Sequence, residues 1–341
     1  MNAHTRRRLL WQVPFLAFLI IGSFIIVSRQ NGTRYQKLAG EIFSTTYHII
    51  YQCPDKLDSE IMEELQLVDN SLSPFNDTSI ITHVNRNEPT ELNDLFTEVF
   101  SLARKVSQQT DGAFDITVAP LVNAWGFGFK NGLTPDAHTI DSLKTLVGYD
   151  KVDIVGSKVR KQQHNTQLDC SAIAKGYACD RIARLLKSHD VENFMVEIGG
   201  ELVTQGVSEK RVPWRVGVNK PVEDPLNVSS ELQTILNVTN VAMATSGNYR
   251  NFYYKDGRRY AHTIDPKTGH PVEHSLLSAT VLARTCAEAD AYATAFMVMG
   301  MERAKAILEK HPELMAYFIY SDKKGENSVW FSPKMEKKIV K

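Results

Sequence analysis

The sequence predicts an α+β fold on three observations. Segments rich in β-branched and aromatic residues outnumber those with helical spacing, and the two kinds alternate irregularly, unlike the strands and helices of a doubly wound sheet. Of the 341 residues, 43% are hydrophobic and 23% are charged, which is typical of a globular protein. An uncharged stretch precedes the globular part, so we expect one N-terminal transmembrane helix and then one domain of about 310 residues.

The N-terminal segment is the first expected element. Residues 9–28 carry no charge, and as a helix they span about 30 Å, one hydrocarbon thickness. Arginines at positions 6–8 precede this run, so the positive-inside rule puts the rest of the chain outside the cytoplasm. Because no small-x-small cleavage site follows, we expect residues 1–30 to form an uncleaved signal anchor and residues 31–341 the soluble domain. A cleaved signal peptide and a buried helix are the alternatives.

The elements of the soluble domain follow from hydrophobic periodicity. Residues 34–42 are expected to be a polar lead-in. Apolar residues three or four positions apart predict helices at 58–70, 92–110, about 174–188, and 287–299 with Gly300 as its C-cap. Strand-forming residues predict strands at 43–52, 153–155, 158–160, 194–198, 214–218, 232–238, 241–245, 251–254, 259–264, 314–320 and 329–331. Asp256-Gly257 is typical of a tight hairpin turn.

Charge and cysteine content exclude several classes of protein. The 39 basic residues balance the 39 acidic ones, so no net field attracts nucleic acid. Four cysteines, none in a CxxC pair, are too few for a disulfide scaffold and argue against a zinc or iron–sulfur site. Neither GxGxxG nor a P-loop motif is present, so Rossmann and P-loop readings have no support.

Two polar segments are suited to binding a ring and an anion. In the turn at 111–120, Phe114 could stack on a flat ring and Asp115 could accept a hydrogen bond, although a plain turn with a core phenylalanine would look the same. Asp169 ends a strand, and the small residues after it lead into a helix whose free N–H groups favour an anion. The positive charge of Lys175 in the first helical turn is unfavourable to the helix dipole unless a bound anion offsets it, which hints at a phosphate. The alternative is a lysine that is simply solvated.

Two further segments carry a candidate base and candidate metal ligands. His262 ends a strand before a proline-containing turn and could act as a base or ligand, or be an ordinary surface histidine. Asp290 and Thr294 are four residues apart, so they share one face of an alanine-rich helix and offer hard oxygen donors suited to Mg²⁺. An exposed aspartate and a back-bonded threonine are the alternative. Taken together, the four segments suit a nucleotide diphosphate with Mg²⁺.

Six motifs in one order resemble the ApbE family of FAD:protein FMN transferases. They are DGAFDITVAPLVNAWGFG (111–128), LDCSAIAKGYACDRIA (168–183), EIGGE (197–201), ATSGNYR (244–250), HTIDPKTGHP (262–271) and AEADAYATAFMVMG (287–300). The resemblance runs from about residue 43 to 301. It implies an ApbE-like mixed fold of two intertwined α/β subdomains with FAD bound between them. It also implies Mg²⁺-dependent transfer of the FMN part of FAD to a threonine or serine hydroxyl of a target protein, with release of AMP.

The resemblance also implies roles for individual residues. Asp290 and Thr294 would bind Mg²⁺ through their side chains and Ala172 through its carbonyl. The residues implied to hold FAD are Phe43, Phe75, Ala113, Phe114, Asp115, Asp169, Lys175, His262 and Ile264. Phe43 departs from the family pattern, because Phe-Ser-Thr stands where Met-Gly-Thr is common. His262 is the expected catalytic base, and Asp265 could replace it or orient it.

Partners and location follow from the same resemblance. It implies flavin-accepting subunits of ion-pumping quinone reductases, or of related electron-transfer complexes, as targets. With the expected anchor, it implies a single-pass protein of the bacterial inner membrane whose catalytic domain is periplasmic. Two alternatives stay open: a Mg²⁺-dependent FAD pyrophosphatase that gives FMN and AMP, and a non-catalytic FAD-binding module.

Overall fold

A computed structural model of the chain describes residues 3–128, 134–221, 231–248, 252–255 and 258–340. Its centre is an eight-stranded sheet in which every neighbouring pair is antiparallel. In spatial order the strands are β1 (Tyr35–Ile42), β2 (Thr45–Gln52), β5 (Phe194–Ile198), β6 (Glu201–Gln205), β9 (Ala242–Gly247), β12 (Leu276–Ala283), β13 (Met315–Ser321) and β14 (Asn327–Phe331). An antiparallel sheet with separate helices confirms the expected α+β class.

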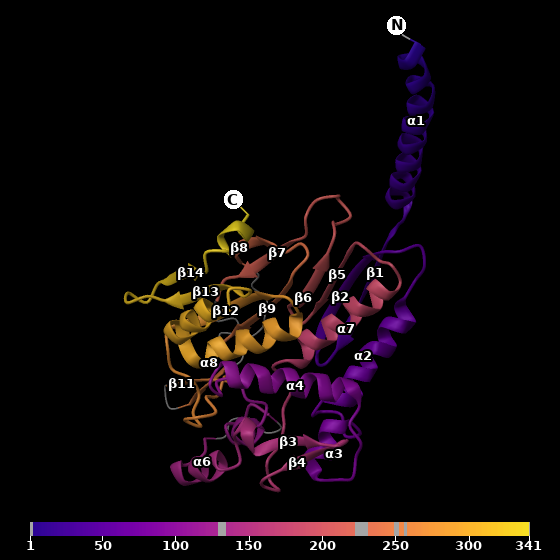
Figure 1. Ribbon diagram of the computed structural model, residues 1–341. Coiled ribbons are helices and arrows are strands. Elements are labelled where there is room, and N and C mark those ends of the chain that lie inside the picture. The colour runs from indigo at the N-terminus through magenta and orange to yellow at the C-terminus, as the bar shows by residue number, and fades with distance from the viewer. Residues whose placement is uncertain (1–2, 129–133, 222–230, 249–251, 256–257, 341) are drawn as a thin grey trace.

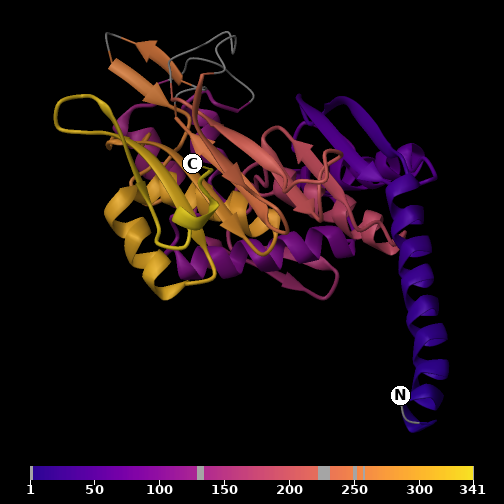
Figure 2. The same ribbon diagram turned by 90° about the horizontal axis from the view of Figure 1, so that it is seen from above.

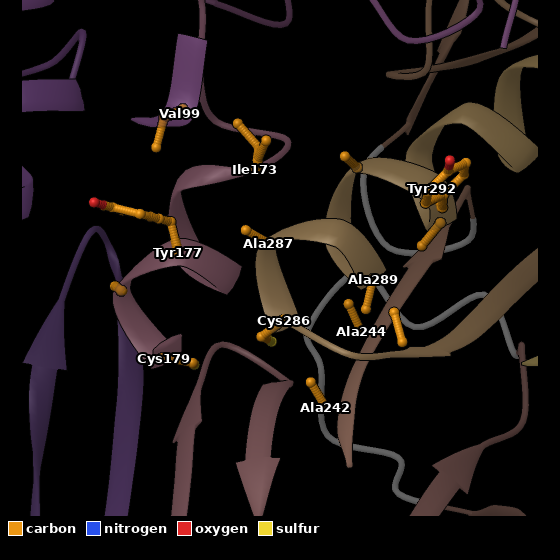
Figure 3. Close-up of a cluster of buried hydrophobic side chains, with 14 of the residues drawn as sticks. Val99, Ile173, Tyr177, Cys179, Ala242, Ala244, Cys286, Ala287, Ala289 and Tyr292 are labelled. Atoms are coloured by element: carbon orange, nitrogen blue, oxygen red, sulfur yellow. The ribbon is translucent and has the colours of Figure 1, made fainter. Parts of the chain in front are cut away.

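Helices cover one face of this sheet (Figures 1 and 2). Helix α7 (Ala174–Ser188) packs on β5 and β6, and α8 (Cys286–Lys310) packs on β9 and β12. Helices α2 (Asp58–Leu72) and α4 (Asp94–Gln109) pack against α7 and α8 in a second layer. Figure 3 shows the buried side chains where α4, α7 and α8 meet, with Val99, Tyr177 and Ala287 among them. Small residues at this junction let the helix backbones approach closely.

The opposite face of the sheet is covered by β7 (Arg215–Asn219), β8 (Leu232–Asn237) and the C-terminal residues around the 3₁₀ turn η2 (Glu336–Lys338). This hairpin is a separate two-stranded sheet. Trp214 and Met335 pack with sheet residues such as Met243 and Tyr317 in a second core. The central strands β6 and β12 are therefore mostly buried on both faces.

The remaining elements form a smaller lobe beyond α4 (Figure 1). It contains α3 (Ile80–Arg86), α5 (Ala119–Ala124), α6 (Ala137–Lys144), η1 (Tyr149–Lys151), β3 (Val152–Val155), β4 (Lys158–Lys161), β10 (Phe252–Lys255) and β11 (Arg258–Ala261). A third core joins α5 and α6 to the loop after β11 through Leu121, Trp125 and Ile264. Trp125 Nε1 donates a hydrogen bond to the Gly269 carbonyl at 2.8 Å and fixes that loop.

Several expected elements differ in the structure. Residues 34–42 were expected to be a lead-in, which is wrong: they form the edge strand β1. Strands β6 and β12 and helices α3, α5 and α6 were not predicted. The helix expected at 287–299 does end at Gly300, whose angles are non-helical (φ 74°, ψ 172°); what was not expected is a second helical segment that continues after this kink, so that α8 extends to Lys310. The predicted Asp256-Gly257 turn lies outside the described residues.

The N-terminal segment is helix α1 (Ala3–Gly32), which points away from the rest of the chain (Figures 1 and 2). Among the described residues, no helix reaches the combination of length and hydropathy needed to cross a membrane. The transmembrane helix expected within residues 1–30 stays a prediction.

Candidate functional site

A cleft of about 720 Å³ opens where the sheet, α8 and the smaller lobe meet. Its walls are the β5–β6 turn, β7, the end of β9, one face of α8 and the loops near residues 113–118, 169–172 and 262–266. The predicted site residues found in its lining are Phe75, Ala113, Phe114, Asp115, Asp169, Ala172, Lys175, His262, Ile264, Asp290 and Thr294. Four separate chain segments predicted from sequence are thus brought to one cavity.

Phe43 is the predicted residue that is not in this lining. It lies in the turn between β1 and β2 with a left-handed backbone (φ 51°) and packs against the main hydrophobic core. The structure therefore gives Phe43 a packing role and does not bring it into the cleft, so its expected contact with FAD has no support.

The polar centre of the cleft is a cluster of two carboxylates and one ammonium group. Asp290 on α8 is 2% exposed, and its Oδ2 accepts a hydrogen bond from the Gly176 N–H at 3.1 Å. Lys175 Nζ lies 3.9 Å from the same oxygen and 3.1 Å from Oε1 of Glu201. With all three groups ionised, the cluster carries one excess negative charge, which a buried site compensates with a cation or a proton.

Burial and charge shift the protonation equilibria of this cluster. Burial raises the pKa of Asp290, and it raises the pKa of Glu201 to about 7, although the nearby Lys175 ammonium opposes both shifts. Burial alone would lower the pKa of Lys175, but the charges of Asp290 and Glu201 outweigh it and hold that pKa above its usual value. Lys175 therefore stays protonated, and the two carboxylates compete for it.

The register between α7 and α8 sets the position of Asp290. Asp180 on α7 accepts hydrogen bonds from the backbone N–H groups of Cys286 (2.8 Å) and Ala287 (2.9 Å), the first residues of α8. Burial raises the pKa of Asp180 to about 6. At Gly176 a Cβ would lie 2.6 Å from the Cys286 carbonyl carbon, closer than real Cβ contacts occur. A shared carboxylate and a glycine contact thus fix α8 against the start of α7.

Thr294 and Ala172 supply the other predicted metal donors. Thr294 lies four residues after Asp290 on the same face of α8, and its Oγ1 is 3.1 Å from Ser246 Oγ at the end of β9. Ala172 lines the cleft in the turn that leads into α7. A carboxylate, a hydroxyl and a carbonyl are hard oxygen donors that fit Mg²⁺. No group of three or more His, Cys, Asp or Glu side chains suited to a metal occurs in the described ranges.

Two predicted acidic residues have donors within the protein. Both oxygens of Asp115 are engaged: Oδ1 accepts from the Thr117 N–H (2.8 Å) and hydroxyl (2.7 Å), and Oδ2 accepts from the Tyr149 N–H (2.8 Å). Burial also raises the pKa of Asp115. This carboxylate therefore holds its own loop in shape. Asp169 Oδ1 accepts from the Ser171 N–H at 2.8 Å and shapes the entry to α7 in the same way.

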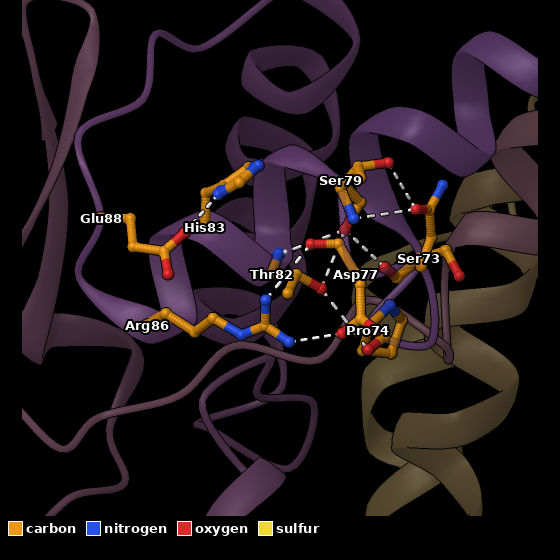
Figure 4. Close-up of polar contacts among 10 residues, drawn as sticks. Ser73, Pro74, Asp77, Ser79, Thr82, His83, Arg86 and Glu88 are labelled. Carbon is orange, nitrogen blue, oxygen red and sulfur yellow. Dashed lines mark hydrogen bonds and ion pairs between the residues drawn. The ribbon is translucent and has the colours of Figure 1, made fainter.

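The aromatic residues of the cleft differ in exposure. Phe114 is 2% exposed and belongs to the main core, whereas Phe75 is 66% exposed, so Phe75 is the better platform for a ring. Its loop is held by polar contacts (Figure 4): the Ser79 hydroxyl donates to the Ser73 carbonyl at 2.6 Å, and Arg86 pairs with Asp77. A stiff loop presents an aromatic ring at low entropic cost.

His262 lies beside Phe127, with the two rings edge to face and their centroids 6.4 Å apart. Both residues line the cleft. Asp265, the predicted substitute for His262, is not in the lining, and its Oδ1 accepts a hydrogen bond from the Lys267 N–H at 2.8 Å within its own turn. The geometry therefore favours His262 over Asp265 as the group that faces a bound molecule.

Sequence reasoning missed several lining residues. They include Phe127, Val216 to Asn219 of β7, Glu197 of β5, Gly199 and Gly200 of the β5–β6 turn, and Glu201 of β6. The EIGGE motif (197–201) belongs to the family resemblance. Its glutamates predict no function from sequence alone, because only the fold places Lys175 beside Glu201. No pattern in residues 214–238 connects that hairpin with the other motifs.

Comparison with known proteins finds relatives that match most of this chain. The ApbE family model matches residues 43–318. The FAD:protein FMN transferase of Vibrio cholerae is 36% identical over 82% of this chain and 86% of its own length. That of Escherichia coli K12 is 32% identical over 84% of this chain and 82% of its own length.

Solved structures of ApbE flavin transferases are also similar to this chain. Flavin transferase ApbE from Vibrio cholerae superposes with a TM-score of 0.81 at 34% identity, covering 90% of this chain and 99% of that one. The apo form of Pseudomonas stutzeri flavinyl transferase ApbE gives a TM-score of 0.80 at 30% identity, covering 89% and 96%. The mixed fold expected from the motifs is thus confirmed. With its motifs, its cleft and these relatives in agreement, the chain belongs to the ApbE family.

Proposed function

We propose that this chain is a Mg²⁺-dependent FAD:protein FMN transferase. The acceptor is a threonine or serine hydroxyl of another protein: its oxygen forms a bond to the FMN phosphorus, the bond from that phosphorus to the AMP oxygen breaks, and the hydroxyl proton leaves. The relatives' names support flavin transfer to a protein. The observation that carries the metal dependence is the convergence of Asp290, Thr294 and Ala172 on one cleft beside Lys175.

Mg²⁺ held by these three residues would polarise the phosphates and make AMP a better leaving group. The chain's own residues would position the FAD and neutralise its phosphate charge, and phosphoryl transfer depends mainly on these two effects. The Lys175 ammonium, which lies beside the carboxylates of the cleft, is the group that supplies positive charge. The exposed ring of Phe75 offers a stacking surface for the flavin. His262 accepts the proton of the acceptor hydroxyl, which is a weak nucleophile without a base.

The test is an Asp290→Ala variant assayed with a purified acceptor protein, FAD and Mg²⁺. We expect no flavin fluorescence on the acceptor band in a denaturing gel, while FAD still binds. Thr294→Ser keeps the hydroxyl and serves as the matched control, expected to retain transfer that Thr294→Ala loses. Full transfer by Asp290→Ala would refute the metal site.

The same assay separates the alternatives. AMP release that is as fast without the acceptor as with it identifies an FAD pyrophosphatase, and FAD binding without AMP release identifies a binding module. We propose subunits of ion-pumping quinone reductases or related electron-transfer complexes as acceptors, and a location outside the cytoplasm. Fractionation of cells that express the full chain tests the location.

A further inference from the structure

Glu201 is a cleft residue to which the family motifs give no role. It is the first residue of β6, it is 4% exposed, and it lines the cleft. Its Oε1 accepts the Lys175 ammonium at 3.1 Å, and within the described part of the chain its Oε2 has no hydrogen-bond partner. A buried carboxylate oxygen without a donor has lost its hydration and gains no hydrogen bond in return. Such a cost at a binding site points to a functional reason for the charge.

The β5–β6 turn aims this carboxylate at α7. Gly199 (φ 64°) and Gly200 (φ 101°) both have left-handed backbones, which glycine adopts without strain. A Cβ at Gly199 would lie 3.3 Å from Glu201 Oε2, so the side chain passes directly over the glycine. The Glu201 carbonyl also accepts from the Cys179 thiol of α7 at 3.3 Å. Backbone and side chain of Glu201 are therefore both tied to α7.

Glu201 competes with Asp290 for one ammonium group. Lys175 Nζ is 3.1 Å from the Glu201 carboxylate and 3.9 Å from that of Asp290, so the closer pairing is with Glu201. Coulomb attraction falls with distance, and in a buried site it is strong enough to decide where a flexible lysine rests. If Glu201 had no charge, the ammonium would move to the remaining carboxylate, Asp290.

We infer that Glu201 is a positioning residue of the metal site: its carboxylate holds the Lys175 ammonium and thereby leaves Asp290 to the divalent cation. An Asp290 paired directly with an ammonium is a poor ligand, because the lysine occupies its lone pairs and repels a second cation. The inference rests on the proposed function only in requiring that a divalent cation binds at Asp290.

The test measures Mn²⁺ binding and not turnover. Mn²⁺ is titrated into the full chain loaded with FAD, and the loss of the free-ion EPR signal gives the dissociation constant. We expect Glu201→Gln to weaken binding by about 10- to 100-fold, the range found for residues that position metal ligands. Glu197→Gln is the matched control: it removes a charge from the same cleft, but Glu197 pairs with His48 (2.8 Å) and the Gly200 N–H (2.6 Å). Its affinity should stay near that of the unchanged protein.

A double variant identifies the cause. Adding Lys175→Gln to Glu201→Gln removes the competing ammonium, so Mn²⁺ affinity should rise. This rise should be larger than the change in Mn²⁺ affinity that Lys175→Gln causes in the otherwise unchanged protein. An affinity of Glu201→Gln equal to that of the unchanged protein, or no recovery in the double variant, would overturn the inference. If Asp290→Ala also leaves Mn²⁺ binding unaltered, the ion binds elsewhere, and the metal site of the proposed function fails instead.

Discussion

Gly176→Ala sets two ordinary effects of an added methyl group against each other. By helix propensity alone, the change would stabilise α7 by about 1 kcal/mol. The new Cβ, however, would lie 2.6 Å from the Cys286 carbonyl carbon and 2.9 Å from the Ala287 nitrogen, both backbone atoms that cannot rotate away. Overpacking of this kind costs about 1–3 kcal/mol. The Gly176 N–H bond to Asp290, a charged hydrogen bond worth about 1.5–3 kcal/mol, would also stretch.

The sum predicts a net loss of about 2 kcal/mol in the free energy of unfolding. Urea unfolding followed by circular dichroism measures it as a lower midpoint at unchanged slope. Gly22→Ala is the control, because nothing lies within 4 Å of its Cβ position in α1. Mn²⁺ affinity should fall as well, since Asp290 on α8 moves away from Ala172 at the start of α7. A Gly176→Ala protein as stable as the unchanged one would refute the close packing of α7 on α8.

Three further predictions concern single side chains. Phe75→Ala removes an exposed ring, so FAD affinity measured by fluorescence quenching should fall by about 2- to 10-fold while the unfolding midpoint stays the same. Burial raises the pKa of Asp180 to about 6, so its folded state binds the proton more tightly than the unfolded state. Relative to Asp180→Asn, the unchanged protein should therefore gain up to about 3 kcal/mol as pH falls from about 7 to about 4; an equal pH dependence of unfolding in both proteins would contradict this. Trp125→Phe leaves the Gly269 carbonyl without its donor and should cost about 1–3 kcal/mol in thermal unfolding.

Hydrophobic periodicity in the sequence predicted the helices and strands in which that periodicity is strong. The helix expected at 92–110 is α4 (Asp94–Gln109), and the hairpin expected at 153–160 is β3 and β4. The edge strand β1 was missed because its sequence, YQKLAGEI, mixes polar and small residues, and its pairing with β2 decides its conformation. Strand β12 lies under α8 with most residues buried, so its sequence has no alternation to detect.

The site was predictable where a motif carries its own chemistry. Asp290 and Thr294 share a face because of helical spacing, and the structure brings both to the cleft. Partnerships between distant residues were not predictable: Asp115 is satisfied by Tyr149, and Lys175 is shared with Glu201. Spacing along the chain contains no information on contacts made across the sheet.

The carboxylate of Asp180 has a consequence for local opening of the fold. Because it holds the first amides of α8 from within α7, neither helix can detach without exposing those amides to solvent exchange. The donors near Ala172 and those at Asp290 and Thr294 therefore belong to one cooperative unit. If the proposed cation binds these residues, we expect slower deuterium uptake in both helices together, and protection at Cys286 and Ala287 would report binding that occurs a full turn away.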